Sequence, residues 1–169
     1  METVELKFKY TQAEYVKAHQ QYLFASKIIT KTSVIVLAFY LSFAMLYFFL
    51  SSFSVYSMIA LGVGLFGLIV GGAVYYYLPI YQFKKTLKYH EEYNLTFSNA
   101  SIKFKTSAID SELRWNIYSE IWENADFYYL IQAPGLYALL PKRAFLSLTA
   151  KQVFEEMALS NLKSIRHVL

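Results

Sequence analysis

The sequence predicts an α+β membrane protein in which a two-helix transmembrane hairpin is joined to a small antiparallel β domain capped by a C-terminal helix. Three observations lead to this fold class. Residues 32–83 form a run of 52 residues without a charged side chain or a histidine. Short stretches of alternating apolar and polar residues follow this run, and an amphipathic helical pattern closes the chain.

The uncharged run is long enough for two membrane crossings and too long for one. A bilayer core takes about 20 helical residues, whereas one helix of this length would extend about 78 Å. We therefore expect spans at about 32–50 and 57–81, joined by a serine-rich turn. Tyrosines gather at the span ends, which is typical of the headgroup level of a membrane. The run is too long and begins too late for a cleavable signal peptide.

The sequence divides into three parts: residues 1–31 (strand and amphipathic helix), 32–83 (hairpin) and 84–169 (β domain). The charges beside the hairpin predict its orientation in the membrane. Residues 1–31 carry a net charge of +2 and residues 84–88 carry +3, whereas the turn between the spans carries none. Basic residues beside a span remain on the cytoplasmic side during insertion. Both termini are therefore expected in the cytoplasm.

Two questions stay open for the N-terminal part. Alternation over residues 3–10 predicts a half-buried strand, and the spacing of Thr11 and Glu14 predicts the start of a helix. That helix either lies at the membrane interface or merges with the first span. The strand either stands alone or joins the C-terminal sheet, and in the second case the hairpin is an insertion into one fold.

The C-terminal part alternates like a sheet. Strands are expected at 93–97 and 102–106, near Leu113 and Trp115, at 121–125, and at 127–132 and 136–140, the last ending at Pro141. Ala133-Pro134-Gly135 is a turn signal between the final two strands. Thr149 and Gln152 predict the start of a closing helix whose apolar face extends to Ile165. Antiparallel strands followed by one amphipathic helix form the outline of a pleckstrin-homology-like (PH-like) domain.

Small residues mark one face of the second span: Ala60, Gly64, Gly67 and Gly71. Such a face lets another helix approach closely in lipid. The favoured interpretation is packing against the first span near Ala38 and Ser42, and the alternative is homodimerisation. The glycines at 62, 64 and 67 also match a dinucleotide fingerprint, but a phosphate cannot reach backbone N–H groups inside an apolar span.

The composition argues against most catalytic chemistry. No cysteine is present, and His19, His90 and His167 lie in separate segments without metal-ligand spacing. No catalytic, metal or cofactor site is expected, and the protein is not predicted to be an enzyme. A set of acidic residues is predicted to form a solvated rim: Asp110, Glu112, Glu120, Glu123 and Asp126.

Basic residues are the candidate contact site for lipid headgroups or a protein partner. They are Lys84, Lys85, Lys88, Lys142 and Arg143, with Lys7, Lys9, Lys103 and Lys105 as further members of a cationic collar. Each basic group near an anionic membrane surface contributes about 1 kcal/mol. Nucleic acid is not expected as a partner, because no recognition motif accompanies the lysines.

Three short stretches resemble the YcxB-like family of small bacterial membrane proteins: 113–121 (Leu-Arg-Trp-Asn-Ile-Tyr-Ser-Glu-Ile), 127–130 and 140–145. The order of strand, capped helix and apolar hairpin is also similar to that family. The resemblance implies a multi-pass protein of the bacterial inner membrane and supplies no established activity. We therefore expect a non-enzymatic protein that presents a cytoplasmic PH-like interaction domain. The alternative is a small immunity or transporter-accessory protein acting through its hairpin.

Overall fold

The computed structural model describes residues 3–162 and 164–168, and it has an α+β architecture. The chain divides into two compact units. One combines Met1–Thr11 with Thr86–Leu169 and is rich in strands, and the other is the helical segment Gln12–Lys85. This division differs from the predicted one, because the first strand and the first helix belong to different units.

The first sheet settles the open question about the N-terminal strand. It has four antiparallel strands in the order β1 (Val4–Phe8), β2 (Tyr93–Phe97), β3 (Ile102–Lys105) and β4 (Asp110–Leu113). The pairing of β1 with β2 runs from Val4 opposite Phe97 to Phe8 opposite Tyr93. The N-terminal strand therefore joins the sheet, and the helical segment is an insertion between two neighbouring strands.

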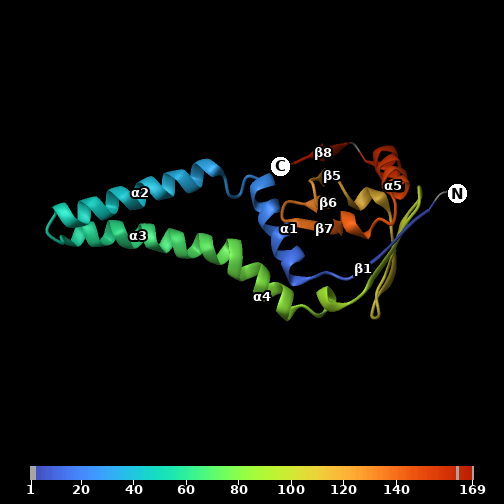
Figure 1. The fold of residues 1–169 in the computed structure, drawn as a ribbon, viewed down its shortest axis with the longest axis horizontal. Coiled ribbons are helices and arrows are strands. Elements are labelled where there is room, and N and C mark those ends of the chain that lie inside the picture. The colour runs from blue at the N-terminus through green and yellow to red at the C-terminus, as the bar shows by residue number, and fades with distance from the viewer. Residues whose placement is uncertain (1–2, 163, 169) are drawn as a thin grey trace. The chain divides into compact units, whose positions relative to one another are not determined.

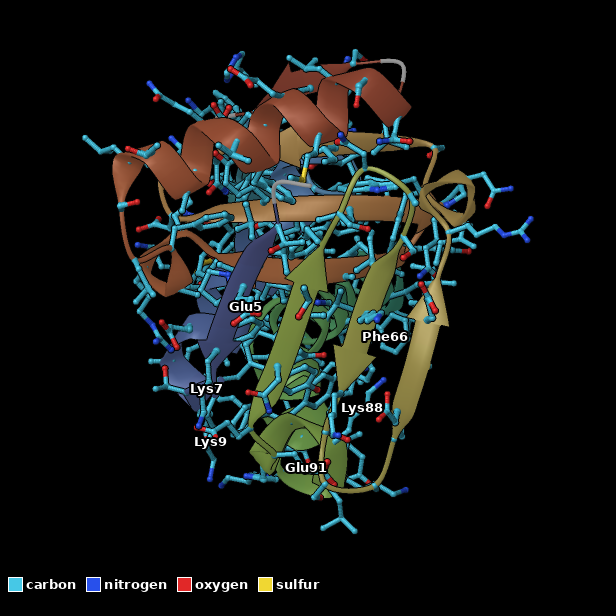
Figure 2. All side chains as sticks on the ribbon, turned by 90° about the vertical axis from the view of Figure 1, so that its right-hand side faces the viewer. Glu5, Lys7, Lys9, Phe66, Lys88 and Glu91 are labelled. Atoms are coloured by element: carbon cyan, nitrogen blue, oxygen red, sulfur yellow. The ribbon has the colours of Figure 1, made fainter. Side chains whose placement is uncertain are left out.

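Alternation in β1 gives the first sheet one buried and one solvated face. Val4, Leu6 and Phe8 are buried. Glu5, Lys7 and Lys9 follow one another along the exposed side of this segment (Figure 2). This is the pattern expected of an antiparallel sheet that packs on a core with one face only.

The second sheet has the strand order β7-β6-β5-β8, with bounds β5 (Glu120–Glu123), β6 (Phe127–Ala133), β7 (Leu136–Pro141) and β8 (Ile165–His167). The predicted turn between β6 and β7 is confirmed, with Gly135 at a φ of +79°, a conformation that glycine adopts without strain. β8 pairs with β5 in parallel, so this sheet is mixed.

Helix α5 (Leu148–Asn161) packs an aromatic side chain into the core of the same unit. The ring of Phe154 is completely buried and lies 4.9 Å from the ring of Phe97 in the first sheet and 5.3 Å from that of Tyr128 in the second. Trp115 is also buried, and its Nε1 donates a hydrogen bond to the Ser98 carbonyl at 2.8 Å. These rings connect the two sheets.

Three local predictions for this unit are wrong. Ser147 caps α5 by accepting from the Ala150 N–H, so the helix begins before Thr149. It ends at Asn161, and Ile165 belongs to β8. Trp115 lies in a 3₁₀ turn that follows β4 and is not part of a strand.

The helical unit contains the two apolar helices, which lie side by side (Figure 1). Helix α2 (Lys31–Leu50) begins with a capping box between Thr30 and Ser33. Helix α3 (Val55–Gly72) continues through a π-helical turn (Ala73–Tyr77) into α4 (Leu78–Lys85). The preceding helix α1 (Gln12–Ala25) ends before α2, so it does not merge with the first span.

Both apolar helices expose their side chains. Helix α2 and the continuous helix Val55–Lys85 are long and apolar enough to cross a membrane, and only 6% and 11% of their apolar windows are buried. Phe43 and Phe66 are 70% and 68% exposed. A helix in the core of a soluble protein buries such side chains, whereas lipid solvates them.

Candidate functional site

A group of charged residues converges on the second sheet, and we call it the Glu123 cluster. Its members are Glu123 on β5, Tyr128 on β6, Lys142 just after β7, Lys151 and Glu155 on α5, and His167 on β8. Glu123 lies directly opposite both Tyr128 and His167 in the strand register. The two neighbouring strands thus place these side chains on one face.

A tight turn sets this register. The Asn124 side-chain oxygen accepts hydrogen bonds from the N–H groups of Asp126, at 3.0 Å, and Phe127, at 2.8 Å. Asparagine favours such turns because its side chain imitates a backbone carbonyl. The turn fixes Glu123 at the end of β5.

Three cationic or potentially cationic groups bind the Glu123 carboxylate, whose side chain is 10% exposed. Lys142 Nζ lies 2.5 Å from Oε1 and Lys151 Nζ lies 3.6 Å from the same oxygen. His167 Nδ1 lies 3.0 Å from Oε2. A buried carboxylate needs such partners, because its desolvation is costly.

Tyr128 forms the floor of the cluster. Its hydroxyl donates a hydrogen bond to the Glu155 carboxylate, and the Nζ atoms of Lys142 and Lys151 lie 4.8 and 5.8 Å from the centre of its ring. An ammonium group over an aromatic face is attracted by the ring quadrupole. Burial, followed by the bond to Glu155, raises the pKa of Tyr128, so the phenol remains protonated.

Opposing effects act on Glu123. Burial by itself would raise the pKa of Glu123, but the hydrogen bond from Lys142 and the charges of Lys142, Lys151 and His167 together hold that pKa below its usual range. The carboxylate is therefore ionised at neutral pH. The prediction that Glu123 belongs to a solvated rim is wrong. His167 lies in β8, beyond the closing helix.

The predicted contact residues are distributed over both units. Lys84 and Lys85 end α4, and the Lys85 Nζ lies 5.5 Å from the Tyr81 ring centre. Lys88 belongs to the strand-rich unit and lies over Tyr89 at 5.2 Å. These lysines remain candidates for contact with lipid headgroups.

Lys142 and Arg143 both have structural partners. Lys142 binds Glu123 with a side chain only 18% exposed. The Arg143 Nη2 donates to the Lys9 carbonyl at 2.9 Å, just beyond β1. Both side chains therefore have structural roles, and their proposed contact with lipid or a partner stays a prediction.

The small face of α3 contacts α2 at three of its four residues. A Cβ atom on Gly64 would lie 2.5 Å from Leu41 Cδ2 and 2.9 Å from Tyr40 Cε1, and one on Gly67 would lie 3.6 Å from Leu37. The Tyr40 hydroxyl donates to the Ala60 carbonyl at 2.9 Å. The facing surface differs from the predicted pair Ala38 and Ser42. Space around Gly71 is open.

Helix α1 is held to the π-helical turn by polar contacts. The Gln20 Nε2 donates to the Tyr75 carbonyl at 3.4 Å, and the His19 ring bonds to the Val74 backbone. Burial lowers the pKa of His19, against the effect of that bond. A π-helical turn changes the local carbonyl pattern of a helix, and here two neighbouring carbonyls accept bonds from α1.

Within the described residues, no group of three or more histidine, aspartate or glutamate side chains is arranged to hold a metal ion. The Glu123 cluster has matched lysines and carboxylates.

Residues 97–158 match the family model described as YcxB-like protein. This segment is similar to the YcxB-like family. The match contains the three stretches that suggested the resemblance and every member of the Glu123 cluster except His167. No curated protein and no solved structure matches the chain. The N-terminal strand and the apolar hairpin lie outside the YcxB-like segment.

Replacing Gly64 by leucine should destabilise the hairpin, because the added side chain collides with Leu41 and the Tyr40 ring. We expect the free energy of unfolding in detergent to fall by about 1–3 kcal/mol. Gly71→Leu is the matched control, since open space surrounds Gly71. Equal stability of the two variants would contradict intramolecular packing at Gly64.

Acid should weaken the strand-rich unit through Glu123. Because folding lowers its pKa, the stabilisation from this carboxylate is fully present above the unfolded value of about 4.3 and is lost as pH falls through the lower folded value. Denaturant titrations below that pH should show a shallower loss of stability for Glu123→Gln than for wild type. The exposed Glu156→Gln should follow the wild-type profile. Parallel profiles for wild type and Glu123→Gln would rule out this role of Glu123.

Proposed function

We propose that this chain is a non-enzymatic integral membrane protein that presents a PH-like interaction domain on the cytoplasmic side of a bacterial inner membrane. In this proposal, α2 and α3 are two spans of an anchor and the strand-rich unit binds a protein partner or a lipid headgroup. Two four-stranded sheets and helix α5, which follows the first seven strands and precedes β8, support the PH-like assignment.

The observation that carries the proposal is the insertion of an uncharged hairpin between two paired strands. β1 and β2 are hydrogen-bonded neighbours, so the chain must leave and re-enter the same folded unit. A sheet with unsatisfied backbone groups at its edge cannot lie in lipid, so paired strands lie on the same side of the membrane. A hairpin that joins them has to cross the membrane an even number of times. Two crossings agree with the two helices that are long enough to span.

The flanking charges support the cytoplasmic side. Lys27 and Lys31 precede the first span, and Lys84, Lys85 and Lys88 follow the second. The turn at 51–54 has no charge. Lysines at this level also attract anionic headgroups within a Debye length of the surface, which favours membrane lipids as one class of partner.

The alternative function, an immunity or transporter-accessory role through the hairpin, has one observation in its favour. Gly62, Gly71 and Gly72 have no neighbour within 4 Å of an added Cβ. A second helix from a partner or another copy would fit there. Gly71→Leu would then abolish complex formation although it leaves the hairpin stable.

Removing the helical unit should convert the protein into a soluble one. Residues 1–11 joined through a short glycine-serine linker to residues 86–169 retain both sheets and α5. We expect this protein to be recovered without detergent, with strand-rich circular dichroism, while the full chain remains in the membrane pellet after carbonate extraction. Recovery of the full chain in the soluble fraction would contradict the anchoring role.

Neutralising the lysines beside the second span should weaken contact with anionic lipid. For the triple variant with glutamine at 84, 85 and 88, we expect a lower fraction of co-purified anionic lipid than for wild type, because about 1 kcal/mol is lost per basic group. The control carries glutamine at Arg114, an exposed basic residue outside the predicted cationic collar. An unchanged lipid fraction in the triple variant would remove these lysines from the proposed site.

A further inference from the structure

Strand β8 covers the edge of β5 that β6 leaves open. The Val168 N–H donates to the Glu123 carbonyl at 2.7 Å, and the Ile121 N–H donates to the Ser164 carbonyl at 3.4 Å. This ladder is only three residues long and parallel. The edge would otherwise present unpaired backbone donors and acceptors, which are a template for another strand.

The side chains of β8 contact both faces of the sheet. Ile165 lies opposite Ile121, which is completely buried. On the opposite face, the Arg166 guanidinium lies 5.4 Å from the Trp122 ring centre. His167, on the same face as Ile165, binds the Glu123 oxygen that neither lysine contacts. An aliphatic residue, a guanidinium and a hydrogen-bond donor therefore meet three matching positions on β5.

The attachment of β8 is shallow. Ile165 is half-buried, Arg166 is exposed, and the His167 side chain is 83% exposed. Three backbone pairs and one ion pair with a mostly exposed histidine hold β8 only weakly to the sheet. A longer strand in the same place would also pair with Glu120, the one residue of β5 that β8 leaves unpaired.

We propose that the edge of β5 is a peptide-binding site and that β8 is its tethered occupant, which an extended segment of a protein partner displaces by parallel strand addition. The partner segment carries an aliphatic residue followed by basic residues, so that it meets Ile121, Trp122 and Glu123 as β8 does. This inference rests on the proposed interaction function and names its site and the chemistry of its partner.

A strand is the occupant that this edge selects. Main-chain hydrogen bonds provide affinity in strand addition, and pockets for alternate side chains provide specificity. A lipid headgroup has no such ladder of donors and acceptors. Glu123 further disfavours an anionic ligand, because its second oxygen faces the incoming segment.

The experiment uses the full chain in detergent and a fluorescein-labelled peptide with the sequence of residues 164–168. Ile165→Asp places a charge opposite the buried Ile121 and should release β8. A tethered segment acts at an effective concentration in the mM range, so its release should lower the dissociation constant of the peptide at least ten-fold relative to wild type.

Two controls make the result specific. Leu159→Asp introduces the same charge on α5 at a side chain that is 56% exposed, and it should bind like wild type. A peptide with alanine at the positions of Arg166 and His167 should lose the gain. Equal peptide affinity in wild type and Ile165→Asp, or equal affinity for the alanine peptide, would overturn the proposal.

A second variant guards against misfolding. If Ile165→Asp loses the circular dichroism of the wild type, a chain ending at Ser164 replaces it, with the same expected gain and the same contradicting result. Carbonate extraction of the full chain reports separately on anchoring. Failure of peptide binding with anchoring intact overturns the peptide site alone, whereas loss of anchoring overturns the proposed function.

Discussion

The pairing of β1 with β2 is the constraint on which the rest of the molecule depends. Five pairs of opposed residues, from Val4 with Phe97 to Phe8 with Tyr93, join chain segments separated by the whole helical unit. Buried side chains of β1 then complete the core of the strand-rich unit. Closing so long a loop costs entropy that grows only slowly with its length. The helical unit is thereby an insertion into a fold rather than a terminal extension of one.

The fold brings together the side chains of the Glu123 cluster. The second sheet holds a buried carboxylate whose partners come from three other elements, and each oxygen of that carboxylate has a different kind of partner. Lys142 and Lys151 both contact Oε1 of Glu123, and their ammonium groups lie over the ring of Tyr128. Among the ion pairs of the described residues, the other oxygen is paired only with His167 on β8. The predicted acid sensitivity and the proposed peptide site therefore both involve Glu123.

Sequence patterns predicted the elements whose determinants are local. Alternation identified β2 and β3, the uncharged run identified α2 and α3, and Pro134-Gly135 identified the turn between β6 and β7. The small face of α3 also indicated helix packing, which the structure places at Gly64. In each case a few neighbouring residues determine the conformation.

The remaining features depend on distant contacts. Arg166 and His167 have the charge expected at a helix C-terminus, but pairing with β5 draws them into a strand. Glu123 resembles a solvated acid until Lys142, Lys151 and His167 are brought to it by three separate elements. The capping serine Ser147 precedes an equally suitable Thr149, and sequence spacing alone favoured the wrong residue.

Labelling of single cysteines tests the central claim most directly, since the natural chain has no cysteine. Glu5→Cys in β1, Ser52→Cys in the turn and Glu156→Cys in α5 place one exposed thiol on each segment. With a membrane-impermeant maleimide on sealed vesicles, positions 5 and 156 should react from the same side and position 52 from the opposite side. Reaction of positions 5 and 156 from opposite sides would contradict the insertion of a double-crossing anchor into one sheet.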